Sequence, residues 1–545
     1  MLNSSLDYEN NRQSFNWSIP EHYNIAHDAC DKWADGSNKL ALIQEDSTGQ
    51  TQHYSFDQLK AWSDQFASGL QAQGISQGDR VGILLAQGVE TAIAHLAVYK
   101  IGAIAMPLFS LFGFDALQHR LLDSGARALI TNRDGLQKIS HIHAQLPELK
   151  RIYCIDDNPE QTLSAHDFWQ IIHAAKPGQP NKVTTKADDP ALLIYTSGTT
   201  GSAKGALHAH RVLLGHLPGV EMSHNFLPNN AELMWTPADW AWIGGLLDVL
   251  LPAWHHGIPV LAHRFEKFTP EAACDLMARH GVTHTFLPPT ALKSLRHLSN
   301  ITQTWPLKLR SIASGGESLG TELLHWAQTE LGITINEFYG QTECNMIVSS
   351  CSAWFPSQQG IMGKAVPGHD VQIIDDKGHI LPAGQEGHIA VRRPDPVMFL
   401  GYWNQAAATK EKFVGDFLLT GDRGVQDSQG YLRFVGRADD VITSSGYRVG
   451  PGPIEDCLLA HPAVALAAVV GVPDAERTEI IKAVLVLKAG HEPSPTLIKD
   501  IQEHVRSRVA AHEYPRIVEF RSSLPMTTTG KLIRHALRQT ESDQQ

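Results

Sequence analysis

The sequence predicts an α/β protein of more than one domain, with mainly parallel sheet in its first part. Short apolar runs that read as buried strands alternate with segments of helical spacing, and this alternation indicates βαβ units. The chain has 545 residues, which is too long for a single hydrophobic core. We therefore expect two α/β subdomains, one before and one after about residue 190, followed by parts with a different pattern.

The first subdomain shows the clearest alternation. An apolar run at 80–86 predicts a strand, and apolar residues at helical spacing predict a helix at 88–101. Two more strands are expected at 126–131 and 151–155. In the second subdomain we expect a strand at 191–195, a loop, a helix from about Ala209, and buried strands at 258–262, 282–287 and 309–313.

The pattern changes from about residue 363. Alternating strands at 369–375, 387–392 and 431–435 are separated by Gly, Pro and Asp turns, which predicts an antiparallel or barrel-like piece at 363–437. A last stretch has its own βα pattern, with strands at 464–472 and 481–487 and a helix at 495–510. We place the domain boundary at 437, so that residues 1–437 form an N-terminal domain and 438–545 a C-terminal domain.

The composition is typical of a soluble cytoplasmic protein. A net charge of -12 argues against nucleic-acid binding, which needs a basic face. The 6 cysteines form no CxxC pair, so zinc and disulfide frameworks are not expected and a reducing compartment is. The first seventeen residues lack the pattern of a signal peptide. The most apolar long stretch, 240–254, is too short for a membrane span and contains Asp248.

The strongest candidate for a binding site is the loop YTSGTTGSAKG at 195–205. Its glycines allow a tight turn whose backbone N–H groups converge on an anion. Hydroxyl groups add donors and Lys204 adds positive charge, and we expect the loop to lie between a strand and a helix, where phosphates are commonly held. A flexible surface loop is the alternative. The residues concerned are Thr196, Ser197, Gly198, Thr199, Thr200, Gly201, Ser202 and Lys204.

A second motif, EFYGQTE at 337–343, follows a short strand, and loops at the carboxyl ends of strands bind ligands in α/β sheets. Tyr339 offers a flat face to a base, Thr342 a hydroxyl, and Glu343 a hard oxygen ligand for Mg²⁺. Taken alone, such a glutamate is more often simply solvated. The full set is Glu337, Phe338, Tyr339, Gly340, Gln341, Thr342 and Glu343.

Two further motifs lie near the expected domain boundary and near the end of the chain. Asp422 can accept both hydroxyls of a ribose, and Arg437 and Arg448 can donate to sugar or phosphate. Lys531 follows a glycine in the hydroxyl-rich run LPMTTTGK at 524–531. Taken singly, these residues are equally typical of surface ion pairs and solubilising charges.

The four motifs together, in this order, resemble the adenylate-forming superfamily, which includes acyl-CoA synthetases, luciferases and peptide-synthetase adenylation domains. The similarity runs from about residue 24 to 540, and the chain is most similar to the short- and medium-chain acyl-CoA synthetases. Further resemblance comes from SGGESLG at 314–320 and EYPR at 513–516. The resemblance implies a large N-terminal domain of two α/β subdomains plus a distorted β-barrel, and a small mobile α+β C-terminal domain.

The resemblance also implies a role for each motif. For ATP, the loop 196–204 holds the phosphates, Glu343 binds Mg²⁺, Thr342 contacts the AMP phosphate, and Lys531 reaches the substrate carboxylate and the α-phosphate. The adenine is framed by Gly316, Glu317, Ser318 and Tyr339, and the ribose is held by Asp422 beside Arg437. The C-terminal domain rotates about Asp439 before the second step. The residues that then contact coenzyme A are Ser445, Gly446, Tyr447, Arg477, Tyr514 and Arg516.

The acid is the least defined part of the prediction. Acetate-specific relatives carry a tryptophan where this chain has Gly340, so we expect room for a longer or aromatic acyl group. Trp240 and Trp242 are candidates for one wall of the pocket, with ordinary core packing as the alternative. No lysine or arginine in this stretch would pair with a second carboxylate, which favours a monocarboxylic, apolar acid of short to medium length, branched or aromatic.

We therefore expect an ATP-dependent, AMP-forming acid–CoA ligase. An enzyme that loads a carrier-protein thiol shares every ATP residue and stays an alternative, as does an inactive nucleotide-binding protein on the same fold. The sequence leaves the oligomeric state open, a homodimer included.

Overall fold

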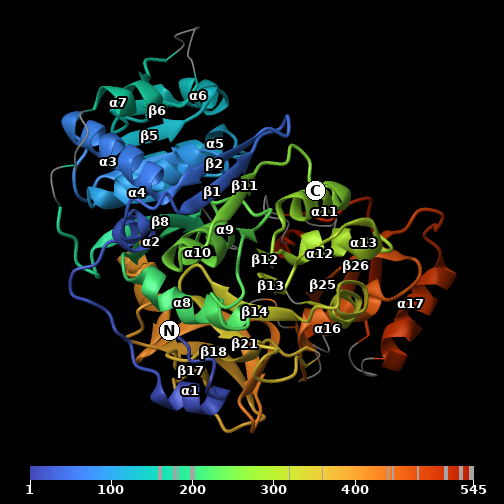
Figure 1. Ribbon diagram of the computed structural model, residues 1–545. Helices are drawn as coiled ribbons and strands as arrows, with labels where there is room; N and C mark the ends of the chain where they lie inside the picture. Colours follow the sequence, from blue (N-terminus) through green and yellow to red (C-terminus); the bar gives the residue numbers. More distant parts are fainter. Residues whose placement is uncertain are drawn as a thin grey trace.

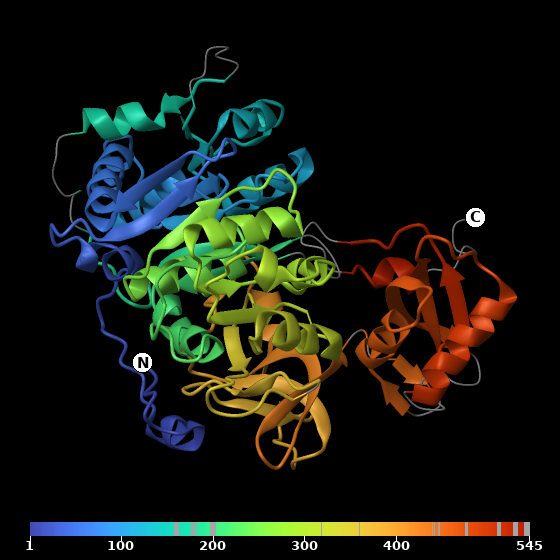
Figure 2. The same cartoon turned by 45° about the vertical axis from the view of Figure 1, so that its right-hand side comes forward.

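The structure is a computed structural model that describes residues 1–156, 163–175, 180, 183–196, 203–317, 319–358, 360–438, 440, 442–444, 447–474, 478–508, 514–526 and 532–538. Its strands form three sheets. Two of them build the large body in Figure 1, and the third lies beside that body in Figure 2.

The first sheet has eight strands in the order β19-β9-β8-β4-β3-β5-β6-β7. Its inner strands pair in parallel, whereas β9 pairs antiparallel with both β8 and β19. Its strands are β3 (Arg80–Leu84), β4 (Ile104–Pro107), β5 (Ala128–Thr131), β6 (Arg151–Cys154), β7 (His166–Asp167), β8 (Pro190–Thr196), β9 (Lys204–Ala209) and β19 (Gly401–Tyr402). The surrounding helices in Figure 1 are α3 (Phe56–Ala72), α4 (Val89–Lys100), α5 (Phe114–Ser124), α6 (Arg133–Ser140) and α7 (Phe168–Ala174).

The second sheet has fourteen strands, with β17-β18-β21-β22-β16-β15-β14-β13-β12-β10-β11-β1-β2 in order and β20 beside β21. One edge of this sheet consists of β1 (Leu40–Glu45) and β2 (Thr51–Ser55). Its parallel centre consists of β10 (Met234–Trp235), β11 (Val260–His263), β12 (His284–Phe286), β13 (Ser311–Gly315) and β14 (Ile335–Gln341). The antiparallel strands are β15 (Asn345–Ser349), β16 (Gly363–Ala365), β17 (Val371–Ile374), β18 (Glu386–Arg392), β20 (Phe413–Val414), β21 (Phe417–Gln426) and β22 (Tyr431–Arg437).

Further helices surround this second sheet and connect it to the first. They are α1 (Tyr8–Ser14), α2 (Ile25–Ala29), the 3₁₀ helix η1 (Asp31–Trp33), α8 (Val212–Ser223), α9 (Ile243–Gly245), α10 (Leu251–His255), α11 (Pro270–His280), α12 (Pro289–Leu295), α13 (Ile301–Thr304), α14 (Thr321–Trp326) and α15 (Ala406–Glu411). In the part of the chain that the structure describes, none of the helices has the length and apolar character that crossing a membrane requires.

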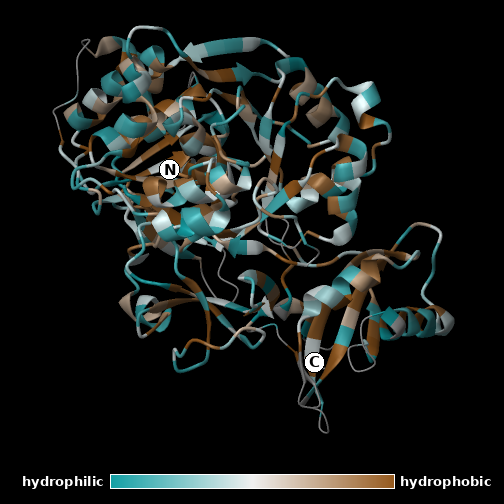
Figure 3. Cartoon of the chain, turned by 60° about the horizontal axis from the view of Figure 1, so that its bottom comes forward, coloured by the Kyte–Doolittle hydropathy of each residue, from teal (hydrophilic) through white to brown (hydrophobic). Residues whose placement is uncertain are grey.

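The third sheet belongs to the C-terminal part and has its own hydrophobic core. It consists of β23 (Ile442–Ser444), β24 (Tyr447–Val449), β25 (Val464–Asp474), β26 (Thr478–Leu487) and β27 (Ile517–Phe520), with the helices α16 (Pro451–Leu459), α17 (Pro495–Arg508) and α18 (His535–Arg538). Figure 3 shows the strands mostly hydrophobic and the outer helical turns mostly hydrophilic, as expected for sheets that bury their faces under amphipathic helices.

The predicted α/β class is confirmed, and every strand named from the sequence overlaps an observed one. Three details differ. A strand, β9, follows the 197–202 loop directly, because residues 204–209 pair with β8, and helix α8 begins only at Val212. The antiparallel strands continue the second sheet, and the described strands form no closed barrel. The sheets also do not divide at residue 190, since β1 and β2 join the second sheet and β8, β9 and β19 the first.

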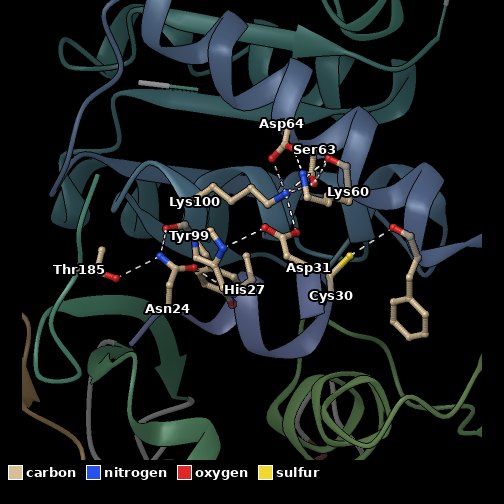
Figure 4. Close-up of polar contacts among 12 residues, drawn as sticks. Asn24, His27, Cys30, Asp31, Lys60, Ser63, Asp64, Tyr99, Lys100 and Thr185 are labelled. Carbon is tan, nitrogen blue, oxygen red and sulfur yellow. Dashed lines mark hydrogen bonds and ion pairs between the residues drawn. The ribbon is translucent and has the colours of Figure 1, made fainter. Parts of the chain in front are cut away.

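A buried charge network fixes the N-terminal segment against helices α3 and α4 (Figure 4). The Lys100 side chain is 2% exposed, and its ammonium lies 2.9 Å from Asp31 and 2.6 Å from Asp64. The Lys100 ammonium also donates a hydrogen bond to the Ser63 hydroxyl at 2.9 Å. Burial raises the pKa of Asp31, but hydrogen bonds from His27 and Lys100 outweigh it and leave that pKa lowered. The network therefore holds a charged lysine where an unpaired one would be strongly destabilising.

Candidate active site

Two of the sequence motifs, represented by residues 314–317 and 337–343, lie side by side at the carboxyl ends of parallel strands β13 and β14. These strands pair so that Gly315 lies opposite Phe338, which places Gly316 and Glu317 beside Tyr339. A side chain at Gly315 would meet the Phe338 ring at 2.6 Å, so this close approach requires a glycine. The geometry is the one expected for ligand binding in α/β sheets, where loops at the strand ends form the site.

Tyr339, Asp422 and Arg437 form one polar cluster. The Asp422 carboxyl is buried, accepts a hydrogen bond from the Tyr339 hydroxyl at 2.5 Å, and lies 3.3 Å from an Arg437 nitrogen. Asp422 and Arg437 are direct partners across β21 and β22, so the backbone holds them together. Burial, with the Asp422 charge next, raises the pKa of Tyr339 well above its usual value, and its hydroxyl remains a donor. A carboxylate held this way suits the two hydroxyls of a ribose.

Glu343, Tyr402 and Lys204 form a second cluster. Thr342 and Glu343 lie in the turn between β14 and β15, and the Glu343 carboxyl is buried. The Tyr402 hydroxyl donates to this carboxylate. The Lys204 ammonium lies 5.3 Å from the centre of the Tyr402 ring. Tyr402 was not predicted from the sequence, because the Gly-Tyr-Trp run at 401–403 has neither a charged residue nor a glycine-rich motif that would indicate a binding site.

The phosphate-loop candidate is closed by a hairpin. Residues 197–202, which include Ser197, Gly198, Thr199, Thr200, Gly201 and Ser202, lie outside the described residues. At its base, Thr196 faces Lys204 and donates to the Lys204 carbonyl at 3.3 Å. The expected position between a strand and a helix is wrong, because β8 and β9 flank the loop and pair antiparallel. A strand, and not a helix N-terminus, therefore follows the loop directly.

Helix α5 anchors both ends of this hairpin. The Tyr195 hydroxyl donates to Asp123 at 2.6 Å, and His119 is hydrogen-bonded to the Ala203 carbonyl at 2.9 Å. The indole N–H of Trp403 donates to the Asp123 carbonyl at 3.2 Å. The same helix thus positions the residues before the loop, after the loop, and next to Tyr402.

A cavity of about 150 Å³ opens beside the Gly316–Glu317 turn. Trp242, a candidate for the pocket wall, lines this cavity, whereas Trp240 is fully buried in the main core. The lining residues are Phe109, Ala238, Asp239, Trp242, Pro288, Pro289, Thr290, Gly315, Gly316 and Glu317. A small, largely apolar pocket with a few polar groups is typical of ligand sites.

Gly340 has a different role from the expected one. A side chain there would place its first carbon 1.4 Å from the Asn345 carbonyl oxygen, and a β-bulge occurs between Tyr339 and Gly340. Gly340 is not among the described residues that line the cavity. The glycine therefore permits the bulge in the β14–β15 hairpin, and its missing side chain faces backbone instead of the pocket.

Two buried carboxyl groups near the cavity have raised pKa values. Burial raises the pKa of Asp239 to about 6, against a hydrogen bond from the Ala241 N–H at 2.8 Å. Burial, together with the charge of Asp456 in α16, raises the pKa of Glu337 to about 8 against the opposing hydrogen bond from the Leu319 N–H. Glu337 is thus neutral at pH 7 and buried behind Phe338 and Tyr339, rather than presented to solvent.

The C-terminal candidates are only partly described. Ser445, Gly446, Arg477 and Lys531 lie outside the described residues, as do the side chains of Tyr447 and Arg448 in β24 and, in the N-terminal part, Ser318. Arg516 is exposed and donates to the Tyr514 hydroxyl at 3.1 Å.

Arg534 shows where the segment after Lys531 lies. It donates to Glu455 at 2.7 Å. Burial lowers the pKa of Arg534, but Glu455 and Asp440, and also Glu317 at the cavity, leave it raised. The segment after Lys531 therefore packs against helix α16 through the Arg534–Glu455 contact.

Two family models match the chain. The AMP-binding enzyme model covers residues 30–403, and the model of the AMP-binding enzyme C-terminal domain covers residues 453–531. The chain belongs to the AMP-binding enzyme family. The similarity to a curated relative is as extensive: acyl-coenzyme A synthetase ACSM2B, mitochondrial, from Homo sapiens is 33% identical over an alignment of 560 positions, which covers 99% of this chain and 95% of the relative.

Solved structures agree with this assignment. The acyl-CoA synthetase from Brucella canis is similar with a TM-score of 0.75 and 32% identity, over 99% of this chain and 100% of that chain. The anthranilate CoA ligase AuaEII, in complex with anthranoyl-AMP, has a TM-score of 0.85 and 28% identity, over 95% and 97%. This AMP-binding enzyme is an AMP-forming ligase with a large N-terminal part and a small C-terminal part.

Proposed function

We propose that this AMP-binding enzyme joins a small monocarboxylic acid to coenzyme A through an acyl-adenylate, using ATP and Mg²⁺. The observation that carries the proposal is the cavity of about 150 Å³ that adjoins the Gly316–Glu317 turn, next to the Tyr339–Asp422 pair. An acid in this cavity would have its carboxylate beside a nucleotide bound through Asp422.

The first step needs charge neutralisation more than proton transfer. The acid is already ionised at pH 7, so its carboxylate oxygen attacks the α-phosphorus of ATP without a general base, and pyrophosphate leaves with the bonding electrons. Both reactants are anions, and cations aligned with them lower the barrier. We assign Lys204 to the phosphates, Thr342 to the α-phosphate and Lys531 to the carboxylate.

The residues around Glu343 fit a magnesium site. Mg²⁺ in nucleotide enzymes is held by one or two carboxylates together with substrate phosphates. Glu343 supplies a buried carboxylate, one oxygen of which accepts a hydrogen bond from the Tyr402 hydroxyl. Among the described residues, no group of three or more His, Cys, Asp or Glu side chains could hold a metal ion by itself, so the substrate phosphates would supply the other ligands. When bound, the ion would neutralise negative charge on the phosphates.

In the second step, the thiol of coenzyme A attacks the acyl carbon, and AMP leaves. We assign Ser445, Gly446 and Tyr447 to the binding of this acceptor, with Arg477, Tyr514 and Arg516 for its phosphates and adenine. The exposed Arg516 beside Tyr514 is a donor available to an anion.

The cavity also narrows the class of acid. Its volume is below the range of about 300–1,000 Å³ typical of drug-sized ligands, which favours short, medium or aromatic acids over long chains. Asp239 and Glu317 are among its lining residues, and their negative charge disfavours an acid with a second carboxylate. We propose a role in the activation of such acids, fatty acids included. A cytoplasmic location stays a prediction, supported by six free cysteines.

Pyrophosphate release with ATP and Mg²⁺ tests the proposal. We would measure it with acids from acetate to decanoate and with benzoate, in the presence and absence of coenzyme A. The expected result is a preference for butyrate to octanoate or for benzoate, with AMP and acyl-CoA formed when coenzyme A is present. Adenylation without acyl-CoA would point to a carrier-protein thiol, and no turnover with any acid would contradict the proposal.

A further inference from the structure

Tyr402 contacts two groups of opposite charge. Its hydroxyl donates to the buried carboxylate of Glu343, and its ring lies 5.3 Å from the Lys204 ammonium. These are the residues that the proposed function assigns to Mg²⁺ and to the ATP phosphates. Tyr402 itself has been given no role in either step.

The backbone and a neighbouring ring fix the position of Tyr402. It lies in β19, opposite Ala206 of β9, and its N–H donates to the Thr409 hydroxyl at 2.8 Å. The next residue, Trp403, donates its N–H to the Gly205 carbonyl at 2.7 Å. Phe399 packs edge-on against the Tyr402 ring, with centroids 5.1 Å apart. The hydroxyl is therefore presented at a set place with little side-chain freedom left to lose.

This placement keeps the two charges apart. Lys204 and Glu343 contact the same tyrosine, and a lysine that paired directly with Glu343 would make this carboxylate less available to a metal ion. Among the residues that the structure describes, no ion pair joins Lys204 to Glu343, and Tyr402 contacts each of them in a different way.

We propose that Tyr402 is a positioning residue, which orients the Glu343 carboxylate for the metal ion and holds the Lys204 ammonium away from it, toward the phosphates. The proposal rests on the assignment of Glu343 to Mg²⁺ in the proposed function. Hydrogen bonds to metal-ligating carboxylates orient them, and losing such a partner typically weakens metal binding by about 10–100-fold.

The test is direct metal binding, measured by electron paramagnetic resonance of Mn²⁺ with α,β-methylene ATP bound. Tyr402→Phe removes the hydroxyl and keeps the ring, and we expect Mn²⁺ affinity to fall on the order of 10-fold. Tyr402→Leu also removes the ring from under Lys204. We expect it to lower the affinity for the nucleotide without metal as well, which Tyr402→Phe should leave unchanged.

Two controls separate the possible failures. Tyr23→Phe removes a matched tyrosine hydroxyl that donates to Asp28 at 2.6 Å, far from the site, and should leave Mn²⁺ affinity unchanged. Glu343→Gln should abolish most Mn²⁺ binding. Normal Mn²⁺ affinity in Tyr402→Phe, with Glu343→Gln impaired, would overturn the positioning role and leave the proposed function intact. Normal affinity in Glu343→Gln would instead overturn the metal assignment, and the role of Tyr402 with it.

Discussion

Replacing Lys100 with methionine should destabilise the fold strongly. The side chain is 2% exposed and neutralises Asp31 and Asp64, both mostly buried. Removing one partner of a buried ion pair typically costs about 3–5 kcal/mol, because it leaves uncompensated buried charge. We therefore expect the free energy of unfolding to fall by about that amount in Lys100→Met, as measured by urea denaturation followed by tryptophan fluorescence at pH 7.

Lys60→Met is a matched control on the same carboxylate. Lys60 and Lys100 both lie 2.6 Å from Asp64, but the Lys60 side chain is 28% exposed. Exposed pairs contribute about 0–1 kcal/mol, so Lys60→Met should stay within that range. Adding Asp31→Asn and Asp64→Asn to Lys100→Met should recover much of the loss, since the uncompensated charges are then gone. Equal costs for Lys60→Met and Lys100→Met would refute the reasoning, because contact distance and not burial would then set the cost.

Three further predictions concern the site. Asp422→Asn removes the charge held by Tyr339 and Arg437, and should weaken AMP binding in calorimetry on the order of 10-fold. Glu337→Gln should gain stability relative to wild type as pH rises, measured as the free energy of unfolding in urea. The folded wild type keeps Glu337 neutral up to about pH 8, whereas its unfolded chain ionises this residue above about pH 4.3, so wild type loses stability between these values and the variant does not. That difference should grow through this window by at most about 1.4 kcal/mol per pH unit and then level off. Trp242→Ala enlarges the cavity, and should raise the ratio of kcat/KM for octanoate over butyrate by about 10-fold or more.

Each of these outcomes can fail cleanly. Unchanged AMP affinity in Asp422→Asn would remove the ribose role. A constant stability difference between pH 5 and 8 would show that Glu337 ionises at its ordinary pKa in the fold. An unchanged acid preference in Trp242→Ala, with Trp240→Phe as the buried comparison, would move the acyl group out of this cavity.

The parts of the fold that depend on local pattern were predictable. Strands with continuous apolar runs, such as β3 and β13, and the helix α17 lie close to their expected bounds, because burial on both faces leaves a clear signal. Strand β9 was missed, since KGALHA carries a lysine, a glycine and a histidine, and its strand state comes from pairing with β8. Sheet membership was not predictable either, because β1 pairs with β11 across a long stretch of sequence.

The candidate site divides in the same way. Residues within recognisable motifs, such as Asp422 and Glu343, could be named from sequence because their chemistry fits a nucleotide. Tyr402 could not, since its importance comes from contacts with residues far away in the chain. Gly340 was noticed for the wrong reason: only the structure shows that its missing side chain faces the Asn345 backbone.

The sharing of strands between the two large sheets has a consequence for biosynthesis. As the chain leaves the ribosome, β1 and β2 emerge long before β11, the strand with which β1 pairs. In the same way, β9 can pair with β19 only after Gly401–Tyr402 has been synthesised. Until then, strand edges that end up paired stay open to other chains, which favours aggregation. The first sheet therefore reaches its final form only when most of the large body has been synthesised. This enzyme thus most needs protection from aggregation during its synthesis.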